Sequence, residues 1–214
     1  MARRKNPPVD EIPEKFRSLA YHARVENVKP LGAGTFGVTF KAAPGWVRKI
    51  TIDPAEVKVV REIKRLRGQH PSVSAREAAV IRRTGTSPER AARLPGIISY
   101  KGPVRKVASG WEYVREDVKP LDASRNASML VAEADAALEI FCAKGPSGRY
   151  IHPDPARFLR RFPWMRRIVQ TMIYLEVVHG VQLEDLHGEQ VGVVLKSSSF
   201  HQRGEVVLFD AQVD

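Results

Sequence analysis

The sequence predicts an α+β fold with a β-rich N-terminal part and a helical C-terminal part. Three observations lead to this prediction. Residues 25–52 alternate β-forming and polar residues around turns that contain glycine and proline. Apolar residues then recur at helical spacing, first over residues 54–93 and again over 124–179. The last stretch, residues 191–214, returns to β-forming residues.

Five strands are expected in the first half of the chain, with helices inserted after the third. Glycines between the first two strands, and a Pro-Gly pair between the second and third, mark tight turns. The segment REDVKPLD at residues 115–122 is expected to be a linker. The five strands are expected over residues 25–32, 37–43, 45–52, 96–102 and 106–114.

The helix after the third strand has a marked beginning. Asp53 can cap it, Pro54 suits its first position, and Glu56 stands three residues after the cap, where a capping box has its acidic residue. Its apolar residues repeat at helical spacing and predict one buried face. That face consists of Val57, Val60, Ile63 and Leu66.

Later helices show similar signals. Ser74 and Glu77 repeat the capping-box spacing before a second helix. An Ala-rich helix is expected over residues 124–142, and a longer one over 163–179. The buried face of the longer helix is expected to include Met165, Ile168, Met172 and Leu175.

Length and composition limit the class of protein. The chain has 214 residues, 43% of them hydrophobic, which suits one two-lobed domain or two small domains. Its net charge of +11 favours an anionic partner, although a solvated basic surface is a simpler alternative. A single cysteine, Cys142, excludes an internal disulfide and is typical of a reducing compartment. No secretory signal and no run of about 18 apolar residues is found, so we expect a cytoplasmic protein without a membrane span.

The stretch LGAGTFGVTFKA at residues 31–42 contains the pattern G-x-G-x-x-G at Gly32, Gly34 and Gly37. A strand follows it, whereas a dinucleotide-binding turn would be followed by a helix. The pattern therefore predicts a glycine hairpin. Such a hairpin can cover a triphosphate because its backbone amides approach the oxygens freely, but a plain hairpin is the alternative.

Four further residues could serve phosphate chemistry. Lys49 could pair with phosphate oxygens. Asp185, in LEDLHGEQVGV, could orient or deprotonate a hydroxyl group, and Gln190 could offer a carbonyl oxygen to Mg²⁺. Asp210 ends the apolar strand VVLFD and could bind a hard metal ion that bridges phosphates. Taken singly, each could be an ordinary surface or turn residue.

Taken in order, these segments resemble the protein-kinase-like superfamily. LGAGTFGVTFKA resembles its glycine-rich loop and WVRKI its lysine-bearing strand. DLHGEQVGV resembles the catalytic loop of small-molecule kinases and of short bacterial or phage kinase-like proteins, and LFDAQ resembles the metal-binding D-F-G segment. The resemblance implies a two-lobed fold with an antiparallel β-sheet N-lobe and a reduced helical C-lobe. We expect a mobile basic N-terminus at 1–19, the N-lobe at 20–120 and the C-lobe at 121–214.

The resemblance also implies site roles, with ATP and Mg²⁺ as cofactors. Lys49 would pair with the phosphates and Asp185 would position the acceptor hydroxyl. Asp210 and Gln190 would hold Mg²⁺. The residues that cover the phosphates would be Gly32, Gly34, Thr35, Phe36 and Gly37.

The glutamate that pairs with Lys49 has two candidates in the resemblance. REIKRLRGQHPSV resembles the helix whose Glu is followed by His-Pro, which points to Glu62. PSVSAREAAVIRR resembles the same helix and points to Glu77. Glu62 is preferred because its helix follows Lys49 directly, and either residue could instead be a surface charge.

The implied activity is transfer of the γ-phosphoryl group of ATP to a hydroxyl acceptor on a protein or a small molecule. Glu184 stands where protein kinases usually have Arg, and Gln190 replaces the usual Asn. These departures leave two alternatives open. One is a pseudokinase or basic binding module that contacts nucleic acid or an acidic protein, and the other is transfer of AMP.

A basic stretch in the C-terminal half could bind single-stranded nucleic acid, because aromatic residues stand between its arginines. The preferred alternative is that the aromatic rings pack inward and the arginines are solvated. The arginines are Arg149, Arg157, Arg160, Arg161, Arg166 and Arg167, and the aromatic residues are Phe158, Phe162 and Trp164.

Overall fold

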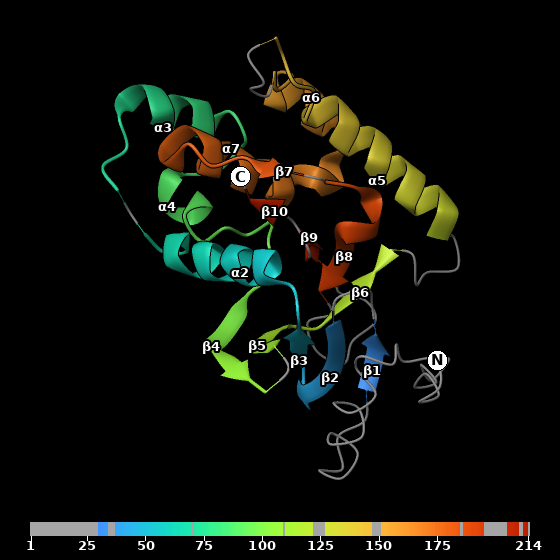
Figure 1. Cartoon of the computed structure of the whole chain (residues 1–214). Coiled ribbons are helices and arrows are strands. Elements are labelled where there is room, and N and C mark those ends of the chain that lie inside the picture. Colours follow the sequence, from blue (N-terminus) through green and yellow to red (C-terminus); the bar gives the residue numbers. More distant parts are fainter. Residues whose placement is uncertain are drawn as a thin grey trace. The chain divides into compact units, whose positions relative to one another are not determined.

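The computed structural model of the chain divides into two compact units (Figure 1). Unit 1 comprises Met1–Glu62 and Ser99–Asp117, and unit 2 comprises Ile63–Ile98 and Val118–Asp214. The structure describes residues 30–33, 37–69, 71–108, 110–121, 127–146, 151–184, 186–194, 205–209 and 212–213.

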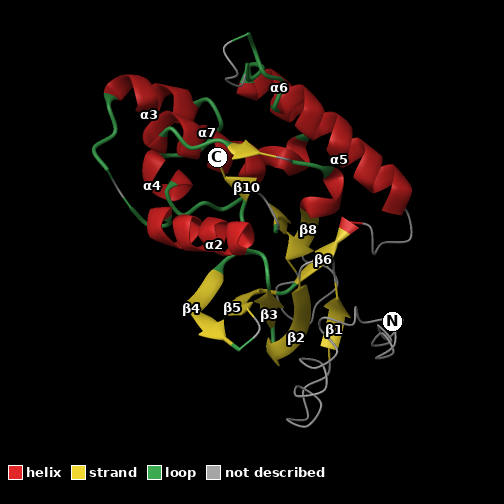
Figure 2. Ribbon diagram, in the orientation of Figure 1, coloured by secondary structure: helices red, strands yellow, loops and turns green. Residues whose placement is uncertain are grey.

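Helices and antiparallel sheets are both present, so the predicted α+β class is confirmed (Figure 2). The strands are β1 (Pro30–Ala33), β2 (Gly37–Ala43), β3 (Trp46–Thr51), β4 (Tyr100–Val107), β5 (Gly110–Glu116), β6 (Val118–Pro120), β7 (Leu183–Glu184), β8 (Val191–Val194), β9 (Glu205–Leu208) and β10 (Gln212–Val213). The helices are α2 (Pro54–Leu66), α3 (Ala75–Arg82), α4 (Pro88–Ala91), α5 (Ala127–Phe141), α6 (Pro155–Arg161) and α7 (Arg166–His179), with 3₁₀ turns η3 (Pro163–Met165) and η4 (Gly188–Gln190).

Unit 1 contains an antiparallel sheet of five strands in the order β1-β2-β3-β5-β4. The central strand β3 is bonded to β2 on one side and to β5 on the other, and Val38, Phe40 and Val47 of β2 and β3 are buried. A strand that pairs on both sides has its backbone groups satisfied along its length. The central position therefore fixes the backbone from which the side chains of β3 extend.

Helix α2 begins three residues after β3, as the capping signals predict. The Ala55 N–H donates a hydrogen bond to Asp53 Oδ1 at 2.8 Å, so Asp53 caps the helix. The predicted apolar face is confirmed, because all four of its residues are buried. They are Val57, Val60, Ile63 and Leu66.

The centre of unit 2 is α7. Every residue from Ile168 to Leu175 is buried, so this part of the helix is covered on all sides. Helices α3 and α4 and strand β9 contact it. The predicted buried face, with Met165, Met172 and Leu175 among its residues, is confirmed.

Two small antiparallel sheets complete unit 2. One has the strand order β6-β8-β9, and the other pairs β7 with β10. The linker predicted at residues 115–122 is wrong, because Val118–Pro120 forms β6 and pairs with β8. The partner strand lies more than seventy residues later in the sequence, so no local signal could reveal this pairing.

The stretch predicted as one strand at residues 96–102 is divided between the two units. The Ile98 N–H donates to the Leu208 carbonyl oxygen at 3.1 Å, and the Leu208 N–H donates to the Gly96 carbonyl oxygen at 2.8 Å. This short parallel bridge belongs to unit 2, whereas β4 starts at Tyr100 in unit 1. Residues 96–98 and 100–102 have a similar β-forming composition. They belong to different units because Ile97 pairs with Leu208 whereas Tyr100 pairs with Arg115.

Candidate functional site

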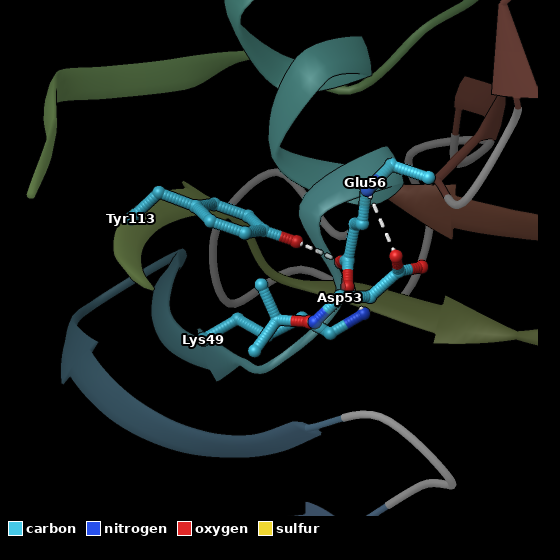
Figure 3. Close-up of polar contacts among 6 residues, drawn as sticks. Lys49, Asp53, Glu56 and Tyr113 are labelled. Carbon is cyan, nitrogen blue, oxygen red and sulfur yellow. Dashed lines mark hydrogen bonds and ion pairs between the residues drawn. The ribbon is translucent and has the colours of Figure 1, made fainter. Parts of the chain in front are cut away.

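Lys49 lies near the middle of β3 and forms an ion pair with Glu56 in the first turn of α2 (Figure 3). Lys49 Nζ lies 2.5 Å from Glu56 Oε1, and the side chains are only 14% and 16% exposed. Because α2 starts directly after β3, its first turn is next to the end of the strand. A pair shielded from solvent to this degree interacts more strongly than a surface pair.

Tyr113 joins the same carboxylate from the neighbouring strand. It is the register partner of Lys49 between β3 and β5, so the two side chains leave the sheet on one face. Its hydroxyl group donates a hydrogen bond to Glu56 Oε1, the same oxygen that contacts Lys49 (Figure 3). Tyr113 is 2% exposed, so its ring is fixed by packing.

The charge of Glu56 is stabilised by these donors. Burial by itself would raise the pKa of its carboxyl group. The positive charge of Lys49 and hydrogen bonds from Lys49, Tyr113 and Thr51 outweigh that effect, so the pKa of Glu56 lies below its ordinary value. Glu56 is therefore an anion at neutral pH.

The start of α2 leaves Glu56 available for this role. The Asp53 N–H donates to Thr51 Oγ1 at 3.1 Å, so the backbone group that a capping-box glutamate would accept from is already bonded. Asp53 supplies the cap, and Glu56 turns toward Lys49 instead.

The partner of Lys49 expected from the sequence, Glu62, is corrected to Glu56. Glu62 is six residues further along α2, which corresponds to about 9 Å of rise and a different side of the helix. The second candidate, Glu77, has another task, since its carboxylate accepts from the Ser74 N–H at 2.6 Å in the capping box of α3.

The glycine hairpin approaches Lys49 at Gly37. A Cβ atom placed on Gly37 would lie 2.6 Å from the Ile50 carbonyl oxygen and 3.3 Å from Lys49 Cε. The backbone of β2 therefore passes directly over the lysine stem at a position where only glycine fits. Gly32 pairs with Thr39 in the β1–β2 ladder. Gly34, Thr35 and Phe36 lie outside the described residues.

In unit 2, the segments that carry Asp185 and Asp210 are joined through their neighbours. Strand β7 ends at Glu184, directly before Asp185, and β10 begins at Gln212, two residues after Asp210. Glu184 and Gln212 are register partners. Asp185 and Asp210 themselves lie outside the described residues.

Gln190 is buried at the end of η4 and meets the segment of Asp210 through its backbone. Its carbonyl oxygen accepts a hydrogen bond from the Phe209 N–H at 3.0 Å. Its side-chain Oε1 accepts from the His187 N–H at 3.4 Å. The carboxamide oxygen that the sequence analysis assigns to Mg²⁺ thus also closes the η4 turn.

Helix α5 holds this turn in place. The Gly188 N–H donates to Asp135 Oδ1 at 2.5 Å. A Cβ atom on Gly188 would collide with the Val131 carbonyl oxygen, so the turn packs directly against the helix backbone. Beyond the helix, Lys144 Nζ contacts Glu184 Oε1 at 2.7 Å, so Glu184 has a cation as its partner.

The basic stretch of unit 2 follows the inward-packing alternative for both phenylalanines. Phe158 and Phe162 are buried and their ring centroids are 5.0 Å apart. Trp164 is half-buried, and its Nε1–H donates to Glu133 Oε1 at 3.1 Å. All three arginines of α6, namely Arg157, Arg160 and Arg161, are exposed. Arg149 lies outside the described residues.

Comparisons of the chain with protein-family models, with curated proteins and with solved structures gave no match. No helix within the described ranges is long and apolar enough to cross a membrane. Among the same residues, no group of three or more His, Cys, Asp or Glu side chains is arranged to hold a metal ion.

Glu56, Thr51 and Tyr113 were not predicted from the sequence as members of the Lys49 cluster. For Glu56 a local signal exists, because the Asp53 cap places it in the first helical turn beside the strand end. For Tyr113 the sequence contains no such signal. Its position opposite Lys49 depends on the pairing of β3 with β5, which are separated by three helices.

Proposed function

We propose that the chain is an ATP- and Mg²⁺-dependent phosphotransferase of the protein-kinase-like superfamily. It transfers the γ-phosphoryl group to a hydroxyl group of a protein or small molecule. The observation that carries the proposal is the shielded Lys49–Glu56 ion pair beside Gly37. A charged lysine on a strand, next to a close-approaching glycine backbone, is suited to pair with phosphate oxygens.

The roles of the other residues follow from the chemistry of phosphoryl transfer. This reaction requires positioning and charge stabilisation from the protein, and little covalent chemistry. Asp185 positions the acceptor hydroxyl and accepts its proton. Asp210 and the Gln190 carboxamide provide the oxygen donors that Mg²⁺ prefers, and bound Mg²⁺ supplies positive charge to the phosphates. Glu184, beside Asp185, pairs with Gln212, and the Gln190 carbonyl oxygen accepts from the N–H of Phe209, beside Asp210. These backbone contacts support a common site for Asp185, Gln190 and Asp210.

The first test is a thermal-shift titration with Mg-ATP on wild type and Asp210→Ala. Ligand at a hundred times its dissociation constant stabilises by about 2.7 kcal/mol, which corresponds to about 5–11 °C for a chain of this size. The wild type should show this shift and Asp210→Ala should lose it. Glu139→Ala, an exposed substitution on α5, is the control and should keep the shift. Absence of a shift in wild type would contradict the proposal.

The second test follows the phosphate itself. Wild type should transfer label from ATP labelled at the γ-phosphate to an acceptor in a hydroxyl-compound and protein screen. Asp185→Ala should lower the rate at least about 100-fold while the Mg-ATP thermal shift remains. Label that moves only from the α-phosphate would indicate AMP transfer instead.

A second candidate function is a nucleotide-binding or basic binding module without catalysis. The observation that favours it is the hydrogen bond from the His187 N–H to Gln190 Oε1. In the phosphotransferase proposal this same oxygen would bind Mg²⁺. A protein of this kind would show the Mg-ATP shift, or binding to a polyanion, but no transfer of label from either phosphate.

A further inference from the structure

The Lys49–Glu56 pair is part of a larger cluster with an unusual distribution of donors. Glu56 Oε1 receives both the Lys49 ammonium group and the Tyr113 hydroxyl group (Figure 3). Thr51 forms a further side-chain hydrogen bond with the Glu56 carboxylate. Three donors from two adjacent strands thus hold one carboxylate.

Two of the three donors, Tyr113 and Thr51, are held in place by their own packing. Tyr113 and Thr51 are 2% and 0% exposed, so packing restricts both side chains. Both belong to strands of the sheet interior, and each strand is paired on both sides. Lys49 differs from them, because its four-carbon stem is flexible and its ammonium group can occupy many positions without a fixed partner.

Gly37 limits the remaining freedom of Lys49. The position that a Gly37 Cβ atom would occupy is 3.3 Å from Lys49 Cε, so the glycine backbone borders the stem on one side. The fixed carboxylate then determines where the ammonium group lies. A change in the position of Glu56 would move that charge relative to Gly37.

We infer that Tyr113 and Thr51 are positioning residues that hold Glu56, and through it the Lys49 ammonium group, for the triphosphate of ATP. This inference rests on the proposed function for its ligand. Both residues act through Glu56 and not through a contact with the nucleotide. Their effect reaches the phosphates only through the orientation of Lys49.

The functional test compares KM for Mg-ATP with kcat. Tyr113→Phe removes one hydroxyl group and keeps the ring, and Thr51→Val removes the other hydroxyl at constant volume. Each should raise KM about tenfold, the worth of one hydrogen bond to a charged group, with kcat changed less. A purely structural role would lower thermal stability and the active fraction but would leave KM unchanged.

Two further variants serve as controls. Thr51→Ser restores a hydroxyl group and should return KM close to the wild-type value. Tyr100→Phe removes a hydroxyl group from the ring that lies edge-on to Tyr113, with centroids 5.8 Å apart. It should leave KM unchanged, since it does not alter the Glu56 carboxylate.

A chemical readout tests the cluster without ATP. The rate at which N-hydroxysuccinimidyl acetate modifies Lys49 is measured by peptide mass spectrometry, with exposed Lys58 of α2 as the internal reference. Wild type should protect Lys49 relative to Lys58. Tyr113→Phe and Thr51→Val should each increase the modification of Lys49 several-fold.

The two readouts separate failure of this inference from failure of the proposed function. Unchanged Lys49 reactivity in both variants would overturn the inference, and so would an unchanged KM in an enzyme that uses ATP. A wild type without any response to Mg-ATP would overturn the proposed function, and the reactivity of Lys49 alone would then decide the positioning role.

Discussion

Glu56 is a carboxylate that remains charged although it is largely buried, because Lys49, Tyr113 and Thr51 surround it with donors. The cost of removing a charge from water is offset here by one opposite charge and several hydrogen bonds. Such an arrangement depends on each member, so the loss of one donor or of the carboxylate itself leaves buried groups poorly satisfied. The cluster should therefore be visible in stability measurements.

Glu56→Gln should lower the free energy of unfolding at pH 7 by roughly 2 kcal/mol, since it removes a charged acceptor of hydrogen bonds. The pKa of Glu56 is below its ordinary value of 4.5, so its contribution is complete above pH 4.5 and is lost as the pH falls further. The difference between wild type and variant should therefore shrink between pH 4.5 and more acidic conditions.

Urea unfolding followed by tryptophan fluorescence measures this, because Trp46 and Trp111 lie in unit 1. Glu139→Gln is the control and should stay within about 0.5 kcal/mol of wild type at each pH. A difference between wild type and Glu56→Gln that does not change with pH would contradict the assigned charge state.

Cys142 is a second residue whose ionisation is set by its surroundings. Burial, together with the negative charge of Glu176, raises the pKa of its thiol to about 12. At pH 8 the native protein should react with iodoacetamide roughly a thousandfold more slowly than the urea-unfolded protein, because only the thiolate is nucleophilic. The rate is measured by mass spectrometry of the single cysteine. Equal rates in the two states would contradict the burial of this thiol.

At the scale of elements, the contact between α5 and the η4 turn is the feature with the clearest consequence. It joins residues 53 positions apart through the Gly188 N–H and Asp135 Oδ1. The carboxylate also shields a backbone donor that the turn cannot satisfy internally. The turn begins three residues after Asp185, so it is close in sequence to the proposed catalytic residue.

Asp135→Ala should lower the free energy of unfolding by about 1–3 kcal/mol, because the Gly188 N–H loses its acceptor. It should also reduce phosphoryl transfer, with the Lys49 cluster of unit 1 unaffected in the acetylation assay. Calorimetry and the γ-phosphate label measure the two effects. Glu139→Ala, one turn further along α5, is the matched control and should change neither. Wild-type stability in Asp135→Ala would contradict the role of this contact.

For the whole molecule, the chain carries a large excess of positive charge. The net charge is +11, and α6 presents three exposed arginines within two helical turns, namely Arg157, Arg160 and Arg161. Closely spaced charges bind a polyanion more strongly than dispersed ones, since each neutralised anionic group releases counterions.

Substitution of the three α6 arginines by Gln should therefore lower the salt concentration at which the protein elutes from heparin. The control replaces Lys41, Arg105 and Lys106, exposed on the sheet of unit 1, and lowers the net charge equally. The α6 variant should elute earlier than the control, and both should keep the Mg-ATP thermal shift. Identical elution of the two variants would show that net charge alone determines retention.

Most of the elements could be predicted because their signals are local. Asp53 caps the helix that follows it, and the apolar face of α2 lies where its spacing indicates. The α+β class follows from the same periodicities. Lys49 could be singled out as a candidate site residue, although only its position after a glycine hairpin distinguishes it from the other basic residues.

The remaining features depend on contacts between distant segments. Strand β6 exists because β8 pairs with it. Residues 96–98 do not continue into β4, because their backbone is hydrogen-bonded to Leu208. A three-residue strand has too few residues to show a pattern of its own. The linker prediction at 115–122 was therefore wrong for a physical reason. The hydrogen bonds that stabilise a strand are made with its partner strand, which a local sequence pattern does not show.

The sequence by itself determined the α+β class, helices α2, α3, α5 and α7, strands β2 and β3, and the positive charge. It also determined the order of Gly37, Lys49, Asp185, Gln190 and Asp210. Only the tertiary structure decided that Glu56, and not Glu62, pairs with Lys49, and that Tyr113 shares its carboxylate oxygen. Helical and strand propensity act between neighbours in the chain, whereas the partner of a charge is selected by distance in space. That distance depends on the register of β3 with β5 and on the turn at which α2 begins.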